Sequence, residues 1–406
     1  MHVLSRRAAV TVFLVFAFAY FFSALIRAIT ATLSPTLTQE FGLNARDLGL
    51  LAGGYFLGFA ATQLPLGKWL DRYGPKRVIC SLLLVAVLGC LAFALARGFT
   101  ALLAARVLCG VGVSACLMAP LTGYRRWFAP SSQMRANSWM LMTGSFGMVA
   151  ATLPVQWLMP VTGWRPIFLG LALLVLLATG LILWLVPAWQ TQAGPSGGGY
   201  AEVWRHPYFR QMAPIGFFSY GGLVAIQTLW AAPWMTKVAG HDPNQAAAGL
   251  FWINITMLCT FWSWGMASGW LARRGLGADR LIALGLPLSF VVLAAIIVAG
   301  PALGAATWAW WALFCMGSTF VSLAQPAVAL AFEPPLVGRA LSAYNLVIFA
   351  GVFVVQWGVG LLVDGFKALG STEVSAFRLA MAVFLACCVW AYGYFLYARR
   401  HNQDRP

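Results

Sequence analysis

The chain carries the stretch Gly67-Lys68-Trp69-Leu70-Asp71-Arg72-Tyr73-Gly74-Pro75-Lys76-Arg77 between two long apolar segments. A partial copy follows later as Ser268-Gly269-Trp270-Leu271-Ala272-Arg273-Arg274-Gly275. A shift of 201 residues aligns Trp69 with Trp270 and Gly74 with Gly275, but it aligns Asp71 with Ala272. A polar loop that recurs between apolar segments predicts a membrane protein built by duplication, and the single Asp71 suggests a gate on one side.

The composition agrees with a chain that lies mostly in lipid. Of 406 residues, 61% are hydrophobic and 9% are charged, whereas soluble domains carry about a quarter charged residues. A spanning helix needs about 20 apolar residues. Hydropathy therefore predicts an all-α membrane protein with twelve transmembrane helices, at about 9–33, 47–67, 78–96, 100–123, 136–158, 166–187, 211–236, 246–267, 280–300, 304–331, 341–363 and 375–397.

The net charge of +16 reflects membrane topology. In the predicted arrangement, 18 of the 26 Lys and Arg residues face one side and six face the other, while Arg27 and Arg106 lie within helices. This asymmetry is typical of the positive-inside rule. It places both termini in the cytoplasm, in a multi-pass protein of a bacterial inner membrane, and it argues against nucleic-acid binding.

The residues that could support catalysis show no suitable pattern. All eight cysteines fall in apolar segments without metal or redox spacing, and all four histidines lie outside the predicted spans. No Ser/His/Asp, Cys/His or paired-carboxylate arrangement is present in the sequence. We therefore expect no enzyme, no metal and no cofactor, and we expect a monomer in the lipid bilayer.

The segment 189–207 is rich in Gly, Ser and Pro and predicts a cytoplasmic linker. It separates two predicted six-helix bundles, residues 1–188 and 208–406. Further echoes join the two halves, such as Phe21-Phe22-Ser23 with Phe217-Phe218-Ser219. An even number of spans in each half preserves its orientation, so the prediction is a parallel pseudo-two-fold repeat.

At this point the chain resembles the major facilitator superfamily over nearly its full length. The first loop, Gly67-x-x-x-Asp71-Arg72-x-Gly74-x-Lys76-Arg77, is similar to that family's signature, and Arg106-x-x-x-Gly110 is similar to its second motif. The resemblance implies that the loop residues form a cytoplasmic gate. It also implies a structural or coupling role for Arg106 and Gly110.

The resemblance to individual branches is partial. Arg27 resembles an arginine in the first span of the organic anion/cation symporters, but Thr122 occupies the position of their second arginine. The Gly-Pro pair of drug/proton antiporters is missing from the fifth span. So are the paired arginines that nitrate porters carry in the second and eighth spans.

Arg27 is the leading candidate for a binding residue. Its side chain would lie deep in the first span, where a charge is costly unless it faces a cavity or a partner. The spacing 3, 4, 3, 4 places one polar stripe on this helix, formed by Tyr20, Ser23, Arg27, Thr30 and Ser34. The functional interpretation is a guanidinium that binds a carboxylate. The alternative is a structural arginine bonded to helix carbonyls.

The acidic residues sharpen this interpretation. All ten lie at span ends, in loops or in the tail, so no mid-membrane carboxylate neutralises Arg27 or would bind a cation. Protons or a counter-anion are the coupling partners left open.

The second half offers neutral polar candidates for the same cavity, namely Tyr220, Gln227, Trp230 and Gln325. The alternative for each is an interhelical hydrogen bond. Taken together, the sequence predicts a secondary transporter that moves a small, carboxylate-like organic anion by alternating access. One alternative is an efflux pump for bulky amphipathic compounds, and another is a receptor or scaffold that does not transport.

Overall fold

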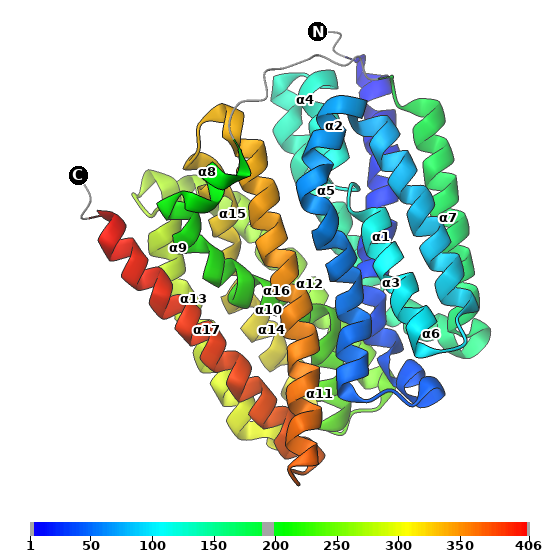
Figure 1. Cartoon of the computed structure of the whole chain (residues 1–406), viewed down its shortest axis with the longest axis vertical. Coiled ribbons are helices and arrows are strands. Elements are labelled where there is room, and N and C mark those ends of the chain that lie inside the picture. The colour runs from blue at the N-terminus through cyan, green and yellow to red at the C-terminus, as the bar shows by residue number, and fades with distance from the viewer. Residues whose placement is uncertain (1–3, 189–198, 404–406) are drawn as a thin grey trace. The chain divides into compact units, whose positions relative to one another are not determined.

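The computed structural model describes residues 4–188 and 199–403, and all regular structure in these ranges is helical (Figure 1). The earlier range contains α1 (Arg6–Phe41), α2 (Ala45–Leu95), α3 (Phe99–Val113), α4 (Met118–Trp127), α5 (Pro130–Ala150), α6 (Leu153–Thr162) and α7 (Trp164–Leu185). The later range contains α8 (Tyr200–Arg205), α9 (Pro207–Ile215), α10 (Gly221–Ala225), α11 (Ala231–Lys237), α12 (Pro243–Arg273), α13 (Ala278–Ala299), α14 (Thr307–Ser318), α15 (Ala324–Leu330), α16 (Pro334–Ala368) and α17 (Glu373–Gln403). Most of the predicted linker, residues 189–198, lies outside the described ranges.

Long apolar helices dominate the described part of the chain. Nine stretches there are long and apolar enough to cross a membrane. A tenth is obtained if Arg135–Ala150 and Leu153–Thr162, which are bent by 43°, count as one span. The predicted all-helical membrane architecture is therefore confirmed, whereas the predicted number of twelve spans is not.

Two of the nine stretches are far longer than one span requires. Ala45–Leu95 has 51 residues and Ala278–Leu330 has 53, against about 20 needed for the hydrocarbon core. The first is interrupted at Gly74, where φ is 78°, and the second at Gly300 and Gly304, where φ is 52° and 46°. Glycine adopts these left-handed conformations without a Cβ clash. The Asp71 segment thus continues α2 as helix up to Gly74 instead of forming an extended loop.

The chain divides into two compact units. Unit 1 comprises Met1–Ile29 and Gly54–Pro195, and unit 2 comprises Thr30–Gly53 and Ser196–Pro406. Both α1 and α2 therefore contribute residues to each unit. The prediction of six-helix bundles at 1–188 and 208–406 stays a prediction.

In unit 1, α2 and α3 approach each other through glycines. A Cβ at Gly58 would collide with the Val107 carbonyl, and one at Gly110 would collide with the Tyr55 carbonyl. Glycine permits this backbone approach because it has no side chain. The close packing brings the middle of α3 against the face of α2 that carries Tyr55.

In unit 2, polar contacts join helix ends. The Asp364 carboxylate of α16 accepts hydrogen bonds from the backbone N–H groups of Ala45 (3.3 Å) and Arg46 (2.7 Å) at the start of α2. Asp279, in the first turn of α13, accepts from Tyr208 (2.6 Å) and Gln211 (2.9 Å) of α9. These carboxylates lie where helix N-terminal dipoles or buried donors favour a negative charge.

Several local devices occur twice in the chain. Glycines with left-handed φ occur in three pairs that are 198, 201 and 207 residues apart, namely Gly42 with Gly240, Gly74 with Gly275 and Gly163 with Gly370. Two arginines also make equivalent bonds to helix carbonyls. Arg165 donates to Ala96 O (3.2 Å), and Arg378 donates to Ile297 O (2.7 Å). The same turn and capping chemistry thus recurs at nearly constant spacing.

Candidate functional site

The polar stripe predicted on the first span lies on one continuous helix, α1. Tyr20, Ser23 and Thr30 are buried, and Arg27 is partly exposed. Three atoms of the stripe, Ser23 Oγ, Arg27 Nε and Thr30 Oγ1, are buried without a hydrogen-bond partner among the described residues. Ser34, in contrast, donates to Ala31 O at 2.8 Å. The stripe therefore presents unused polar atoms in the middle of α1.

Arg27 has an aromatic environment in unit 1. Its guanidinium carbon lies 5.6 Å from the centre of the Phe59 ring of α2, within the range of a cation–π interaction. The Tyr20 and Tyr55 phenols and the Cys116 thiol lie close enough to act on the guanidinium electrostatically. Rings and weakly polar groups thus line the arginine in place of a carboxylate.

No salt bridge neutralises Arg27 among the ion pairs of the described residues. Each acidic residue in the described ranges lies within four positions of a helix end or of the break at Gly74. A guanidinium with an unused N–H donor and no counter-charge favours an anionic ligand. Its planar fork is suited to a carboxylate, which can accept two parallel hydrogen bonds.

Arg106 is the second arginine predicted inside a span, and its environment is different. It is wholly buried in α3, and one terminal nitrogen donates to the carbonyl of Ile26 on α1 at 2.9 Å. Its guanidinium carbon lies 5.0 Å from the centre of the Tyr55 ring. The other two guanidinium nitrogens have no hydrogen-bond partner in the described structure. Gly110, one turn later, provides the close contact with α2.

The sequence did not single out Tyr55 and Phe59, which the structure places beside both arginines. These residues are four positions apart on α2, and their rings stack with centres 6.2 Å apart and planes inclined by 25°. Aromatic residues are common in apolar spans. The available signal was their position next to Gly54 and Gly58, which marks the face of α2 that contacts α3.

The predicted residues of the second half lie in unit 2, where three of them are engaged in hydrogen bonds. Gln227 donates to Asn254 Oδ1 (2.9 Å), Trp230 donates to Gln356 O (3.1 Å), and Gln325 donates to Asn345 Oδ1 (2.8 Å). These are the interhelical bonds that the alternative interpretation describes. Their assignment to a substrate site stays a prediction.

Tyr220, the remaining candidate of the second half, is partly buried and ends a π-helical turn. This turn spans Gly216–Tyr220, and a second one spans Ile226–Trp230. Such turns are rare and are often found at functional sites. They mark the segment from α9 to α11 as locally wide helix, in which side chains are rotated relative to a regular α-helix.

The predicted gate residues surround the break in α2. Asp71 and Arg72 are exposed, and Arg72 lies over the Tyr73 ring with its guanidinium carbon 5.3 Å from the ring centre. Beyond Gly74, Lys76 donates to the Val186 carbonyl at the end of α7 at 2.7 Å. The lysine therefore satisfies a helix C-terminus inside unit 1. Gly67 is partly buried, and Arg77 is exposed.

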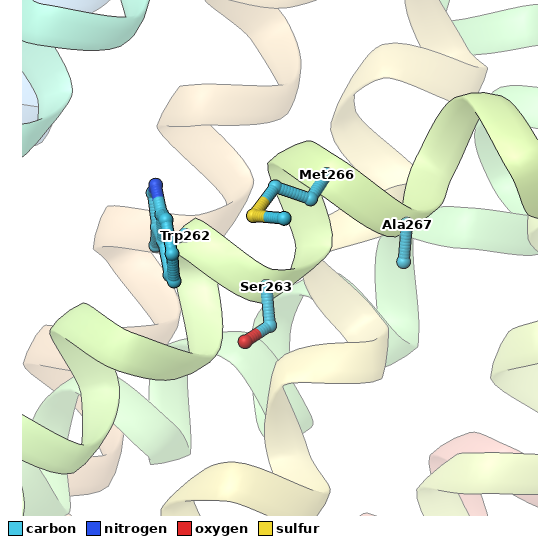
Figure 2. A pocket seen from close by; sticks show the side chains of 4 residues that line it. All are labelled: Trp262, Ser263, Met266 and Ala267. Atoms are coloured by element: carbon cyan, nitrogen blue, oxygen red, sulfur yellow. The ribbon is translucent and has the colours of Figure 1, made fainter.

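The two largest hollows lie elsewhere. One of about 460 Å³ is bordered by two turns of α12, and Figure 2 shows its lining side chains, which are Trp262, Ser263, Met266 and Ala267. The Ser263 hydroxyl is already bonded to Cys259 O at 2.9 Å. The other hollow, about 310 Å³, is an apolar groove along α1, α6 and α7. Neither is lined by Arg27, so the arginine remains the feature that suggests a ligand.

Comparison with known proteins identifies the class to which this fold and site belong. A bacterial homologue of the human lysosomal transporter Spinster superposes with a TM-score of 0.79 at 19% identity, over 99% of both chains. A D-xylose–proton symporter superposes with a TM-score of 0.77 at 12% identity, over 95% of this chain and 97% of the other. The fold is that of membrane transporters.

The family follows from the sequence profile of the Major Facilitator Superfamily, which matches residues 16–356. The chain belongs to this superfamily, and it is a transporter and not an enzyme. Its curated relatives include the gallate transporter of Pseudomonas putida, 30% identical over 165 residues. They also include the 4-hydroxybenzoate transporter PcaK of Pseudomonas aeruginosa (27%) and the probable sulfoacetate transporter SauU of Cupriavidus necator (26%).

These similarities to curated relatives are partial. The aligned stretches cover 39%, 41% and 56% of this chain and 36%, 37% and 57% of the relatives, in the same order. The predicted family is therefore confirmed, while the substrate has to be argued from the site.

Proposed function

We propose that this protein is a secondary active transporter that carries a small organic anion with a carboxylate-like group across a bacterial inner membrane by alternating access. The observation that carries the proposal is Arg27, a mid-helix guanidinium without a counter-charge and with an unused buried N–H. A buried charge in a span is costly unless it serves a ligand or a water-filled path. The bound anion would supply the missing charge.

The surroundings of Arg27 favour an organic anion over a small inorganic one. The Phe59 ring covers the guanidinium at 5.6 Å, and Tyr20 and Tyr55 add further ring surface. Apolar surface beside a charged anchor suits a molecule that has a carbon skeleton as well as a charge. Gallate, 4-hydroxybenzoate and sulfoacetate, the substrates named for three relatives, are molecules of this kind.

The repeated devices support the finer architecture that we propose. If the glycine breaks divide the two longest helical stretches and the bent pair forms one span, the chain has twelve spans in two parallel halves. The three glycine pairs and the two carbonyl-capping arginines recur at spacings close to the 201 residues that relate the two loops. Such parallel repeats are typical of the halves of major facilitator transporters.

In this proposal the Asp71 segment is the cytoplasmic gate. Asp71 and Arg72 are exposed beside a left-handed glycine, where a carboxylate can accept bonds from arginines or a helix N-terminus when the transporter closes. Both termini would then be cytoplasmic, and protons or a counter-anion would drive transport.

The direct test is ligand binding by the purified transporter. Thermal unfolding is measured with gallate, 4-hydroxybenzoate, sulfoacetate and nitrate, since a ligand that binds the folded state raises the apparent stability. We expect organic anions to stabilise the wild type and to lose this effect in Arg27→Ala. Arg165→Ala is the matched control, because Arg165 also stacks on a ring (Trp164, 4.2 Å) and bonds to a helix carbonyl. Equal stabilisation of Arg27→Ala and the wild type would refute the anion site.

A further inference from the structure

Two arginines in unit 1 flank one pair of stacked rings. Arg106 lies over Tyr55 at 5.0 Å, Tyr55 stacks on Phe59 with centres 6.2 Å apart, and Arg27 lies over Phe59 at 5.6 Å. The four side chains come from α1, α2 and α3. They form a continuous series of cation–π and ring contacts, which we call the arginine–aromatic ladder.

A second connection joins the same two arginines through the backbone. Arg106 donates to the carbonyl of Ile26, the residue directly before Arg27, at 2.9 Å. Tyr55 also reaches α1, where its hydroxyl lies 3.5 Å from the Ser23 carbonyl. Both contacts fall on the turn of α1 that ends at Arg27. The α3 arginine thus constrains the backbone of Arg27 as well as its ring partner.

Arg106 is poorly suited to a purely structural role. It is completely buried, yet two of its three guanidinium nitrogens have no partner among the described residues. A residue selected only to join helices would leave less of its hydrogen-bonding capacity unused in an apolar environment. Complete burial also prevents Arg106 from touching a substrate, whereas Arg27 is partly exposed.

We propose that Arg106 is a positioning residue for Arg27. Through the Ile26 carbonyl and the stacked Tyr55–Phe59 pair, it holds the Arg27 guanidinium in the orientation that receives the anion. The proposal deepens the proposed function and rests on it for the role of Arg27. The geometric part, that Arg106 controls the orientation of Arg27, can be tested without any ligand.

The ligand-free test measures the reactivity of Arg27 toward phenylglyoxal, which modifies guanidinium groups, by mass spectrometry of the purified protein. We expect Arg106→Gln to change the rate of Arg27 labelling by about threefold or more, because the guanidinium loses a fixed environment. Arg165→Gln is the matched control and should leave the rate unchanged. Wild-type labelling of Arg27 in Arg106→Gln would overturn the proposal.

Arg106→Lys separates position from charge. Lysine keeps the positive charge but lacks the planar group that stacks on Tyr55 while donating to Ile26. We expect Arg27 labelling in this variant to resemble that in Arg106→Gln. Restoration of the wild-type rate by lysine would show that only the charge is needed, and it would overturn the positioning role.

Phe59→Leu addresses the ladder without altering the buried arginine, so it remains informative if the Arg106 variants do not fold. Removal of the ring under Arg27 should increase its labelling, and an unchanged rate would overturn the ladder. Uptake of 4-hydroxybenzoate into proteoliposomes then links the ladder to transport. Arg106→Lys should raise KM by about tenfold with a much smaller change in kcat. If the wild type binds and transports none of the anions, the proposed function fails, while the labelling result still decides the positioning role.

Discussion

Along α1, buried polar atoms lack hydrogen-bond partners, whereas the amides of the helices after residue 199 largely bond to one another. Ser23, Arg27 and Thr30 each have an unpartnered buried atom. In unit 2, Gln227 bonds to Asn254 and Gln325 bonds to Asn345. Interhelical hydrogen bonds of this kind stabilise a membrane protein by roughly 0.6 kcal/mol each. The difference indicates which polar residues are committed to the fold and which remain available to a ligand.

The contrast has one informative exception. Ser219, which the repeat aligns approximately with Ser23, also has an unpartnered buried hydroxyl. It lies in the π-helical turn Gly216–Tyr220, where regular backbone bonding is interrupted. The corresponding turns of the two halves therefore share an unused hydroxyl, but only the first half adds an arginine one turn later.

The largest expected effect comes from Arg27→Lys, which sharpens the comparison by keeping the charge and removing the fork. A bidentate guanidinium–carboxylate contact includes a charge-assisted hydrogen bond that lysine cannot reproduce, with a contribution of about 1.5–3 kcal/mol. We expect kcat/KM for organic anions to fall by roughly 10- to 150-fold. Proteoliposome uptake measures the effect. Uptake equal to that of the wild type would mean that Arg27 acts only as a charge.

The next effect tests the other side of the comparison. Gln227→Leu leaves the Asn254 side-chain oxygen buried without its donor, so we expect a loss of stability of roughly 0.6–1.7 kcal/mol. The double variant Gln227→Leu/Asn254→Leu should recover part of this loss, because both polar partners are then absent. Unfolding in detergent measures stability, and uptake measures function. A large rise in KM with unchanged stability would place Gln227 in the binding site and break the comparison.

The sequence allowed Arg27 to be predicted because a charge inside an apolar span is conspicuous. The spacing of Ser23 and Thr30 then predicted the polar stripe, since helical periodicity depends only on the order of residues. Tyr55 and Phe59 could not be found in this way. Their role depends on which helices are neighbours, and aromatic residues in a span normally serve packing.

The same limitation applies to the second half and to the helix boundaries. The sequence predicted Gln227 and Asn254 as polar positions, but their mutual bond depends on the packing of α12 against the π-helical segment. Hydropathy predicted a loop at residues 67–78, whereas α2 stays helical up to Gly74. A polar helix end and a polar loop have the same hydropathy, and only backbone conformation distinguishes them.

A smaller effect is expected for the hydroxyls of the α1 stripe. Because Ser23 Oγ has no hydrogen-bond partner in the described structure, Ser23→Ala should leave stability nearly unchanged. If the hydroxyl binds the anion, KM should rise by about two- to tenfold, as expected for one hydrogen bond of roughly 0.5–1.5 kcal/mol. Ser34→Ala provides the control, since Ser34 already donates to Ala31 O. Equal responses of the two variants would remove Ser23 from the site.

Asp71→Asn should have the smallest effect, and it separates gating from binding. Asp71 is exposed, and ion pairs at exposed positions contribute about 0–1 kcal/mol. Loss of its charge should therefore change the transport rate by no more than about fivefold. The order of preference among gallate, 4-hydroxybenzoate and sulfoacetate should stay the same, because substrate choice depends on Arg27 and its aromatic neighbours. Competition assays in proteoliposomes measure that order, and a changed order in Asp71→Asn would show that the gate also takes part in substrate selection.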